Sequence, residues 1–301
     1  MKDPYLLHIF NPTKNVSPFD VNMAYEAEFD GVIPYTDVQL EDVHALTQDT
    51  IFSRGPTGVK RTGIFIGGRE FGLAMDMLNR AKAAMVPPFE VSVFADPSGA
   101  ITTAAALIAC IKFQLNKKNG EDLNGKNLCI LGGTGPVGVC AGILATNCGA
   151  NVYLASRRGE IVAQEVADEY NAQFGVNMQG ADYGAEESIS KLLQISHIMV
   201  GAAKAGVQVL SMRHLEQAPE LQIVADVNAV PPPGIEGVGV NDNGKVLDIK
   251  PNKILSIGAL AIGNVKYKVH HHMFQLMITT DKPLYLDHVR AFESACEYAG
   301  L

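Results

Sequence analysis

A glycine-rich hexapeptide near the middle of the chain has the residue types and spacing needed to bind a phosphate group. Residues 133–138 fit the pattern GxGxxG, directly after the apolar run NLCIL (127–131) and before a helical pattern. In that context the first glycine permits a tight turn, the second lets a pyrophosphate approach the backbone, and the third lets helix and strand pack closely. Proline suits the first turn of the helix, whose N–H groups would face the phosphates. We predict a dinucleotide site made by Gly133, Thr134, Gly135, Pro136, Val137 and Gly138. The alternative is a glycine-rich turn without a ligand.

Two arginines bear on which dinucleotide would bind. Ser156, Arg157 and Arg158 come directly after the next apolar run, 151–155. Proteins selective for NAD usually place an acid about 20 residues beyond the glycines, to bond the ribose hydroxyls, and no acid ends this strand. Guanidinium groups beside a hydroxyl suit a 2′-phosphate instead. We predict NADP as the cofactor, with NAD tolerated because no acid enforces a choice; two solvated surface arginines are the alternative.

Two acids in the first third follow predicted strands. Asp20 lies in Ser17-Pro18-Phe19-Asp20, and Asp96 follows the run 91–94. Open α/β sheets bind ligands at the carboxyl ends of their strands, so either acid is a candidate for substrate binding. Asp is also a common helix cap, and spacing alone does not separate the two roles.

Lysines and histidines share one helical pattern near the C-terminal end. Lys266 and Lys268 cannot share a helix face, so we expect one to point inward and the other into solvent. His270, His271 and His272 are about 100° apart on a helix and do not converge easily on one ion. We predict a solvated or packing role for these histidines and no metal site.

Short apolar runs alternate with helical patterns along the whole chain, which is typical of parallel α/β architecture. Strands are predicted near 6–10, 50–53, 63–66, 91–94, 127–131, 151–155, 197–200, 222–225 and 253–257. Helices are predicted near 21–27, 71–84, 101–115, 136–148, 160–174, 258–276 and 286–298.

The order of these elements suggests an inserted domain. A long helix leads into the second series of strands, and another leads back. We expect a Rossmann-like parallel-sheet dinucleotide domain (108–264) inserted into a second α/β substrate domain (1–107 plus 265–301), with a cleft between them.

Composition excludes several classes of partner. The 301 residues include 24 Lys and Arg against 32 Asp and Glu, a formal net charge of −8. An acidic chain argues against nucleic acid or an anionic membrane as partner. No apolar run reaches the ~18 residues of a membrane span, and the start of the chain lacks a signal-peptide core. The five cysteines are scattered without metal or disulfide spacing. We expect a soluble, cytoplasmic protein.

Several segments in order carry a resemblance to a known family. They are Ser17–Val21, Ile51–Gly55, Ile64–Gly68, Thr102–Ala106, Gly133–Gly138, Ile223–Ala229 and Gly258–Gly263. Over nearly its whole length the sequence resembles the NAD(P)-dependent methylene-tetrahydromethanopterin and methylene-tetrahydrofolate dehydrogenases of methylotrophic bacteria, and the tetrahydromethanopterin branch slightly more.

The resemblance implies oxidation of a methylene group on a reduced pterin to the methenyl cation, with direct hydride transfer to the nicotinamide. It implies that Lys266 is the lysine beside the pterin, where it orients the substrate and tunes charge. It also implies a homo-oligomer, a trimer or a hexamer. The pterin would be surrounded by Phe19, Asp20, Asp96, Thr102 and Thr103, and the nicotinamide end of the cofactor by Gly201, Ala202, Asp226 and Asn228.

Two other functions stay open on the sequence. One is an NADP-dependent carbonyl dehydrogenase of the shikimate dehydrogenase type, for which no paired Lys and Asp can be placed. The other is a non-catalytic Rossmann protein that senses dinucleotides, which would bind NADPH without turnover.

Overall fold

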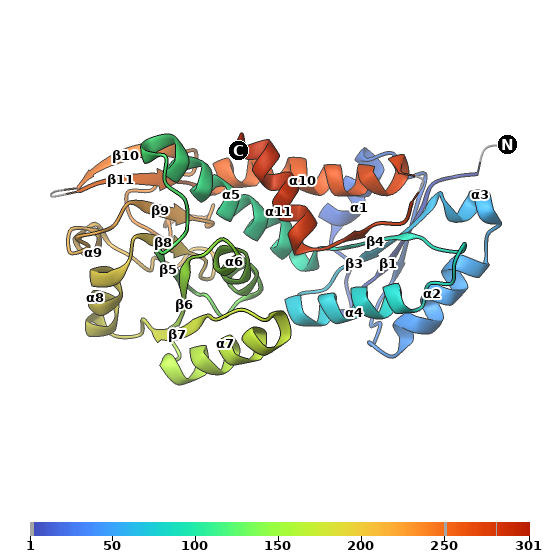
Figure 1. The fold of residues 1–301 in the computed structure, drawn as a ribbon, viewed down its shortest axis with the longest axis horizontal. Helices are drawn as coiled ribbons and strands as arrows, with labels where there is room; N and C mark the ends of the chain where they lie inside the picture. Colours follow the sequence, from blue (N-terminus) through green and yellow to red (C-terminus); the bar gives the residue numbers. More distant parts are fainter. Residues whose placement is uncertain (1–2, 250–251, 281) are drawn as a thin grey trace. The chain divides into compact units, whose positions relative to one another are not determined.

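In the computed structural model, which describes residues 3–249, 252–280 and 282–301, the chain forms two compact units (Figure 1). Unit 1 comprises the residues up to Thr102 together with Tyr267–Ser294, and unit 2 comprises Thr103–Lys266 and Ala295–Leu301. The chain passes from one unit to the other within three helices: α5 (Ala100–Asn119), α10 (Ala259–Thr279) and α11 (His288–Ala299).

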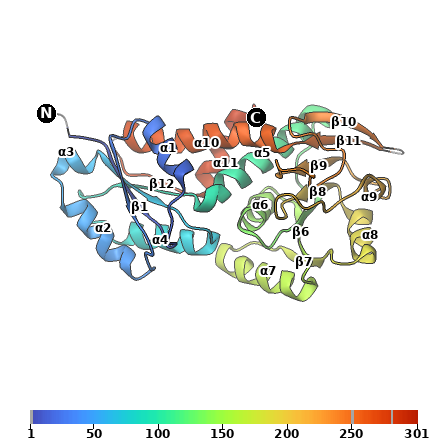
Figure 2. The same ribbon diagram turned by 180° about the vertical axis from the view of Figure 1, so that it is seen from behind.

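Unit 1 is built on a five-stranded parallel sheet with the order β12-β4-β3-β1-β2. Helices α2 and α4 lie on one side of this sheet and α1 on the other (Figures 1 and 2). The strands are β1 (Leu6–Phe10), β2 (Gly31–Tyr35), β3 (Thr62–Ile66), β4 (Ser92–Ala95) and β12 (Tyr285–Leu286). The helices wholly within unit 1 are α1 (Pro18–Glu26), α2 (Asp42–Phe52), α3 (Pro56–Val59), α4 (Phe71–Ala83) and the short 3₁₀ turn η1 (Pro97–Gly99).

Phenyl rings form the centre of the unit 1 core. The rings of Phe65, Phe94 and Phe274 lie with their centroids 5.3 Å apart in each pair, and all three side chains are fully buried. The pairs Phe65–Phe94 and Phe94–Phe274 pack edge to face, which stabilises a core beyond its buried area. The cluster joins β3, β4 and α10 under the carboxyl ends of the strands.

Unit 2 is built on a seven-stranded sheet with the order β10-β11-β9-β8-β5-β6-β7. All neighbours are parallel except β10 and β11, which form an antiparallel pair at one edge. The strands are β5 (Asn127–Leu131), β6 (Asn151–Ser156), β7 (Gln179–Asp182), β8 (Ile198–Gly201), β9 (Ile223–Asp226), β10 (Asn243–Ile249) and β11 (Asn252–Ile257). The helices are α6 (Pro136–Asn147), α7 (Glu160–Phe174), α8 (Glu186–Ile195) and α9 (Met212–Leu215). Counted from β5 and without β10, the order is the 3-2-1-4-5-6 of a doubly wound dinucleotide fold, so the predicted fold class is confirmed.

One predicted strand was wrong, and the strands β2, β7 and β10 were not predicted. Residues 50–53, predicted as a strand, end helix α2, because Val43, Thr47, Thr50 and Ile51 follow the helical period and form its buried face. Strand β2 was not predicted; it holds Pro34 and lies at the sheet edge, where a missing N–H is tolerated.

In the part of the chain that the structure describes, one helical stretch, Pro97–Lys118, is long and apolar enough to cross a membrane, and 78% of its most apolar part is buried within the fold. That burial is typical of a core helix.

Candidate functional site

The glycine-rich turn of unit 2 connects β5 to α6, and most of its glycines are required by the fold itself. Gly132 has a φ of +80°, which favours glycine. A Cβ atom on Gly133 would lie 2.7 Å from the carbonyl oxygen of Ile130. A Cβ on Gly138 would lie 2.6 Å from the Cα of Gly133. Any side chain at Gly133 or Gly138 would thus clash with backbone atoms. Glycine at both positions lets helix α6 and strand β5 pack closely.

Gly135 is different, because the surrounding protein does not require it. A Cβ there would meet only the carbonyl oxygen of Gly132, at an ordinary contact distance of 3.5 Å. Gly135 is the N-cap of α6, Pro136 is its first residue, and no side chain caps the helix. The first N–H groups of a helix have no partner within it and attract anions. The open position beside Gly135 is thus a candidate site for a pyrophosphate. Thr134 and Val137, both half-buried, flank it.

The turn after β6 carries the predicted phosphate ligands. Ser156 is buried, and its Oγ atom accepts the N–H of Arg158 at 3.1 Å, which holds the turn. Arg157 and Arg158 are exposed. Burial raises the pKa of the Tyr183 hydroxyl, and the positive charge of Arg157 acts in the opposite direction. Both guanidinium groups can therefore be reached from solvent.

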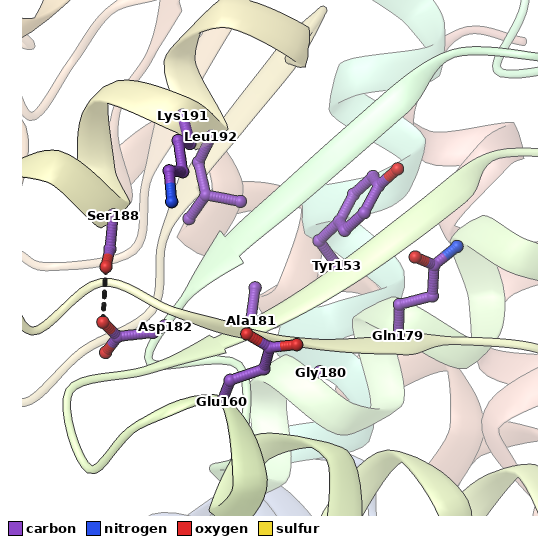
Figure 3. A pocket seen from close by; sticks show the side chains of 9 residues that line it. All are labelled: Tyr153, Glu160, Gln179, Gly180, Ala181, Asp182, Ser188, Lys191 and Leu192. Carbon is purple, nitrogen blue, oxygen red and sulfur yellow. Dashed lines mark hydrogen bonds between the residues drawn. The ribbon is translucent and has the colours of Figure 1, made fainter.

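A pocket of about 250 Å³ lies beyond this turn, between β6, β7 and the start of α8 (Figure 3). Its lining carries the carboxylates of Glu160 and Asp182 against the single ammonium of Lys191. Asp182 is further held by the hydroxyl of Ser188 at 2.6 Å. The excess negative charge of this pocket would repel a phosphate group. The exposed arginines are therefore better candidates for binding a phosphate than this pocket.

The loops after β8 and β9 complete the carboxyl edge of the unit 2 sheet. Gly201 is buried at the end of β8, and Ala202 donates its N–H to the carbonyl of Leu131 at 2.9 Å. Asn228 ties two loops together, since its Oδ1 accepts the N–H groups of Val230 and Gly206.

Asp226 organises the loop that follows it. Its carboxylate accepts the backbone N–H groups of Asn228, Gly234 and Ile235 at 3.0, 2.7 and 3.1 Å. Burial raises the pKa of this carboxyl, and the three backbone donors act in the opposite direction. Asp226 thus shapes the rim of the site through the backbone.

In unit 1 the structure brings several predicted residues together around a buried histidine. The Oδ1 atom of Asp96 accepts the N–H groups of Ile101 and Thr102, at the start of α5. Its Oδ2 accepts the Thr102 hydroxyl at 2.6 Å and lies 2.8 Å from Nδ1 of His270. The side chains of Asp96, Thr102 and His270 are all fully buried. Asp96 thus caps a helix, as its alternative interpretation proposed, and also holds the histidine.

Asp20 and Phe19 approach the same histidine from the first turn of α1. Oδ1 of Asp20 lies 3.9 Å from Nε2 of His270, and the Asp20 side chain is 5% exposed. The Phe19 ring meets the imidazole edge-on at 5.3 Å and is 39% exposed. Phe19 therefore offers the surface that a planar ligand could stack against.

The remaining predicted residues lie where the chain passes between the units. Lys266 is half-buried on α10 and ends the unit 2 segment, whereas Lys268 is exposed. Thr103 is half-buried on α5, directly after the last unit 1 residue of that segment.

His270 is the functional candidate that the sequence did not single out. It was assigned a solvated or packing role, and it does pack among the rings of Phe19, Phe65, Phe94 and Phe274. Its bond to Asp96 spans 174 residues of sequence, so no local pattern indicates it. Across residues 3–249, 252–280 and 282–301, no three His, Cys, Asp or Glu side chains are grouped to hold a metal ion.

The sheet order, the glycine turn and its helix N-terminus define unit 2 as a Rossmann-like dinucleotide-binding unit. Solved structures share the two-unit fold at low identity. The NAD-dependent malic enzyme of Thermotoga maritima has a TM-score of 0.54 at 12% identity, covering 98% of this chain and 84% of that one. Shikimate 5-dehydrogenase of Listeria monocytogenes has a TM-score of 0.51 at 16% identity, covering 91% and 92%. These likenesses concern the fold alone.

The sequence relatives identify the family, which the likeness of fold does not. The family model for the N-terminal part of methylene-tetrahydromethanopterin dehydrogenase matches residues 18–98. The NAD(P)-dependent methylenetetrahydromethanopterin dehydrogenase of Methylorubrum extorquens is 43% identical over 295 residues, covering 98% of this chain and 99% of that protein. The bifunctional protein MdtA of the same organism is 34% identical over 265 residues, covering 88% and 89%. The chain belongs to the methylenetetrahydromethanopterin dehydrogenase family, so the resemblance seen in the sequence is confirmed.

Proposed function

We propose that this protein oxidises methylene-tetrahydromethanopterin to its methenyl form by direct hydride transfer to NADP, as a step of one-carbon metabolism. The observation that carries the proposal is the 43% identity to an NAD(P)-dependent enzyme of that name along 98% of the chain. The open position at Gly135 supports a dinucleotide in unit 2, and the partly exposed Phe19 supports a planar substrate in unit 1.

The cofactor would be held by the carboxyl edge of the unit 2 sheet. The turn from Gly133 to Gly138 binds the pyrophosphate through backbone N–H groups. Arg157 and Arg158 hold the 2′-phosphate, with the turn fixed by Ser156. The loops around Gly201, Ala202, Asp226 and Asn228 shape the nicotinamide end. When bound, NADP supplies the hydride acceptor at C4 of its nicotinamide ring. NAD lacks the 2′-phosphate and binds through the remaining contacts.

The pterin would be bound chiefly by Phe19, which stacks on it, and Asp20, whose carboxylate accepts its N–H donors. Asp96 and Thr102 are fully buried, so they act without touching the pterin. They fix the start of α5 and the position of His270. Thr103 contacts the substrate from the next position of that helix. Lys266 orients the pterin and adjusts the local charge.

The chemistry makes few demands on acids or bases. The C–H bond of the methylene group breaks with its electron pair leaving as hydride, and the resulting cation is shared by two nitrogens. No proton has to be moved. The work of the protein is therefore to align the reacting atoms and to exclude water, which would hydrolyse the methenyl group.

We place the protein in the cytoplasm as a homo-oligomer, a trimer or a hexamer, with a reduced pterin rather than nucleic acid or membrane as its partner. The five cysteines are all free thiols, which suits a reducing compartment.

The test is to incubate the purified protein with methylene-tetrahydromethanopterin or methylene-tetrahydrofolate and either NADP or NAD, and to follow the absorbance of reduced nicotinamide. We expect the highest kcat/KM with the methanopterin substrate and NADP. Turnover of shikimate alone would instead indicate a carbonyl dehydrogenase. Binding of NADPH without turnover of either pterin would indicate a dinucleotide sensor, and both results would overturn the proposal.

A further inference from the structure

His270 has one ring nitrogen that is fully engaged and one that is not. The ring is completely buried, with four phenyl rings around it at centroid distances of 5.0 to 6.0 Å. An apolar core of this kind needs no imidazole for its packing. A polar ring kept in such a place points to a role for its nitrogen atoms.

The Nδ1 atom is fixed by Asp96. The Asp96 carboxylate accepts two hydrogen bonds from backbone N–H groups and one from the Thr102 hydroxyl, so it is anchored to the start of α5. The Nδ1 atom of His270 lies 2.8 Å from the same carboxylate. A carboxylate with this arrangement is an acceptor, and the proton therefore lies on Nδ1. The ring orientation follows from that bond.

The Nε2 atom, by contrast, has no hydrogen-bond partner among the residues that the structure describes. It faces Oδ1 of Asp20 at 3.9 Å, beyond the length of a hydrogen bond. With the proton on Nδ1, a neutral ring would direct a lone pair at this carboxylate, and the two atoms would repel each other. A second proton between them turns the same pair into a strong, charge-assisted hydrogen bond after a movement of about 1 Å.

We propose that His270 is a positioning residue of the pterin site, which holds Asp20 and the neighbouring Phe19 ring through a proton shared between its Nε2 atom and the Asp20 carboxylate. The inference rests on the proposed function, in which these two α1 residues contact the pterin. Asp96 orients His270, and His270 orients Asp20. The buried core of unit 1 thereby sets the position of the residues that receive the substrate.

Two variants of His270 test the roles of its Nδ1 and Nε2 atoms separately. The amide of asparagine can replace Nδ1 toward Asp96 but does not reach the position of Nε2, whereas glutamine reaches Nε2 and leaves Asp96 without its partner. His270→Asn should raise the pterin KM roughly tenfold, with kcat within about threefold of wild type and NADPH affinity unchanged. His270→Gln should restore most of the pterin KM and have the lower melting temperature of the two.

A packing control and a double-mutant cycle show whether the contact itself matters. Phe274→Leu loosens the same ring cluster without touching a polar contact, so it should lower the melting temperature and leave the pterin KM alone. The double variant Asp20→Asn/His270→Asn should have a fold-reduction in pterin kcat/KM much smaller than the product of the fold-reductions of the two single variants. Multiplicative effects, or a wild-type KM in His270→Asn, would overturn the proposal.

Nitrogen-15 NMR of the histidine side chains tests the contact without turnover, with His270→Asn used to assign the ring. Asp20→Asn should shift the Nε2 resonance of His270 and leave those of His197, in unit 2, in place. An unshifted Nε2 resonance would overturn the proposal. If wild type oxidises no pterin, the proposed function fails, and this spectrum still decides whether His270 holds Asp20.

Discussion

Replacing Gly135 by alanine separates binding of the cofactor from folding of the chain. At this position φ is −83° and ψ is 165°, a region open to alanine. The new methyl carbon would lie 3.5 Å from the nearest atom, the carbonyl oxygen of Gly132, so nothing in the protein must move. Gly135→Ala raises the free energy of unfolding by roughly 0.4–1 kcal/mol, because alanine restricts the unfolded chain. Alanine is also a weaker N-cap residue than glycine, which lowers the free energy of unfolding by a similar amount. We expect the melting temperature to change by less than about 4 °C.

Cofactor binding should change much more, because the methyl group would occupy the space that the pyrophosphate needs. A hydrogen bond from a backbone N–H to a charged group contributes about 1.5–3 kcal/mol. Losing one such bond weakens binding about 10- to 150-fold. We therefore expect the KM of NADP and the Kd of NADPH to rise within that range, measured by steady-state kinetics and by titration of nicotinamide fluorescence. The KM of the pterin should stay within twofold when NADP is saturating.

Gly138→Ala is the matched control in the same turn. Its Cβ would lie 2.6 Å from the Cα of Gly133, which forces helix and strand apart. Overpacking of this kind costs about 1–3 kcal/mol, so this variant should melt several degrees lower. If Gly135→Ala binds NADPH like wild type, the pyrophosphate does not lie at Gly135. If Gly135→Ala melts lower than Gly138→Ala, the steric argument is wrong.

Three further predictions concern the arginines, the lysine and pH. Arg157→Ala and Arg158→Ala should each raise the KM of NADP about tenfold or more and hardly change that of NAD; equal effects on both cofactors would contradict the assignment. Lys266→Ala should lower kcat about tenfold or more at unchanged NADPH affinity, whereas the exposed Lys268→Ala should behave like wild type; full turnover in Lys266→Ala would refute its role. Burial, partly offset by a neighbouring carboxylate, lowers the pKa of His288 from 6.5. The unfolded chain then binds the extra proton first, so the free energy of unfolding should fall as pH decreases through 6.5. His288→Asn should lose less stability than wild type in urea unfolding between about pH 7.5 and 5.5; an equal loss would show that other groups carry the effect.

The sequence predicted best where a pattern is local. The strand 127–131, the helix 160–174 and the turn between the first strand and helix of unit 2 follow from periodicity and glycine spacing, and the structure has them at the same residues. It predicted worst where short apolar runs suit both a strand and a helix. The run at 50–53 joined a helix because burial of Val43 and Thr47 extends the same face. The edge strand β10 was missed because it carries charged residues and lacks an apolar run, whereas its antiparallel partner β11 was predicted at 253–257.

The candidate sites divide in the same way. The glycine turn and the two arginines were proposed as a cofactor site from sequence alone, since backbone conformation and helix N-termini depend on residues within about one turn of each other. The group formed by Asp20, Asp96 and His270 was not found, because two of these residues come from the first third of the chain and one from its end. From the sequence, Asp20 and Asp96 were interpreted as capping or ligand residues. His270 was interpreted only as one of three adjacent histidines. Only the tertiary structure decided that one of these histidines enters a closed cluster of phenyl rings. Once buried there, a polar ring needs a hydrogen-bond partner, and its Nδ1 atom finds one in the Asp96 carboxylate, which no sequence spacing connects to His270.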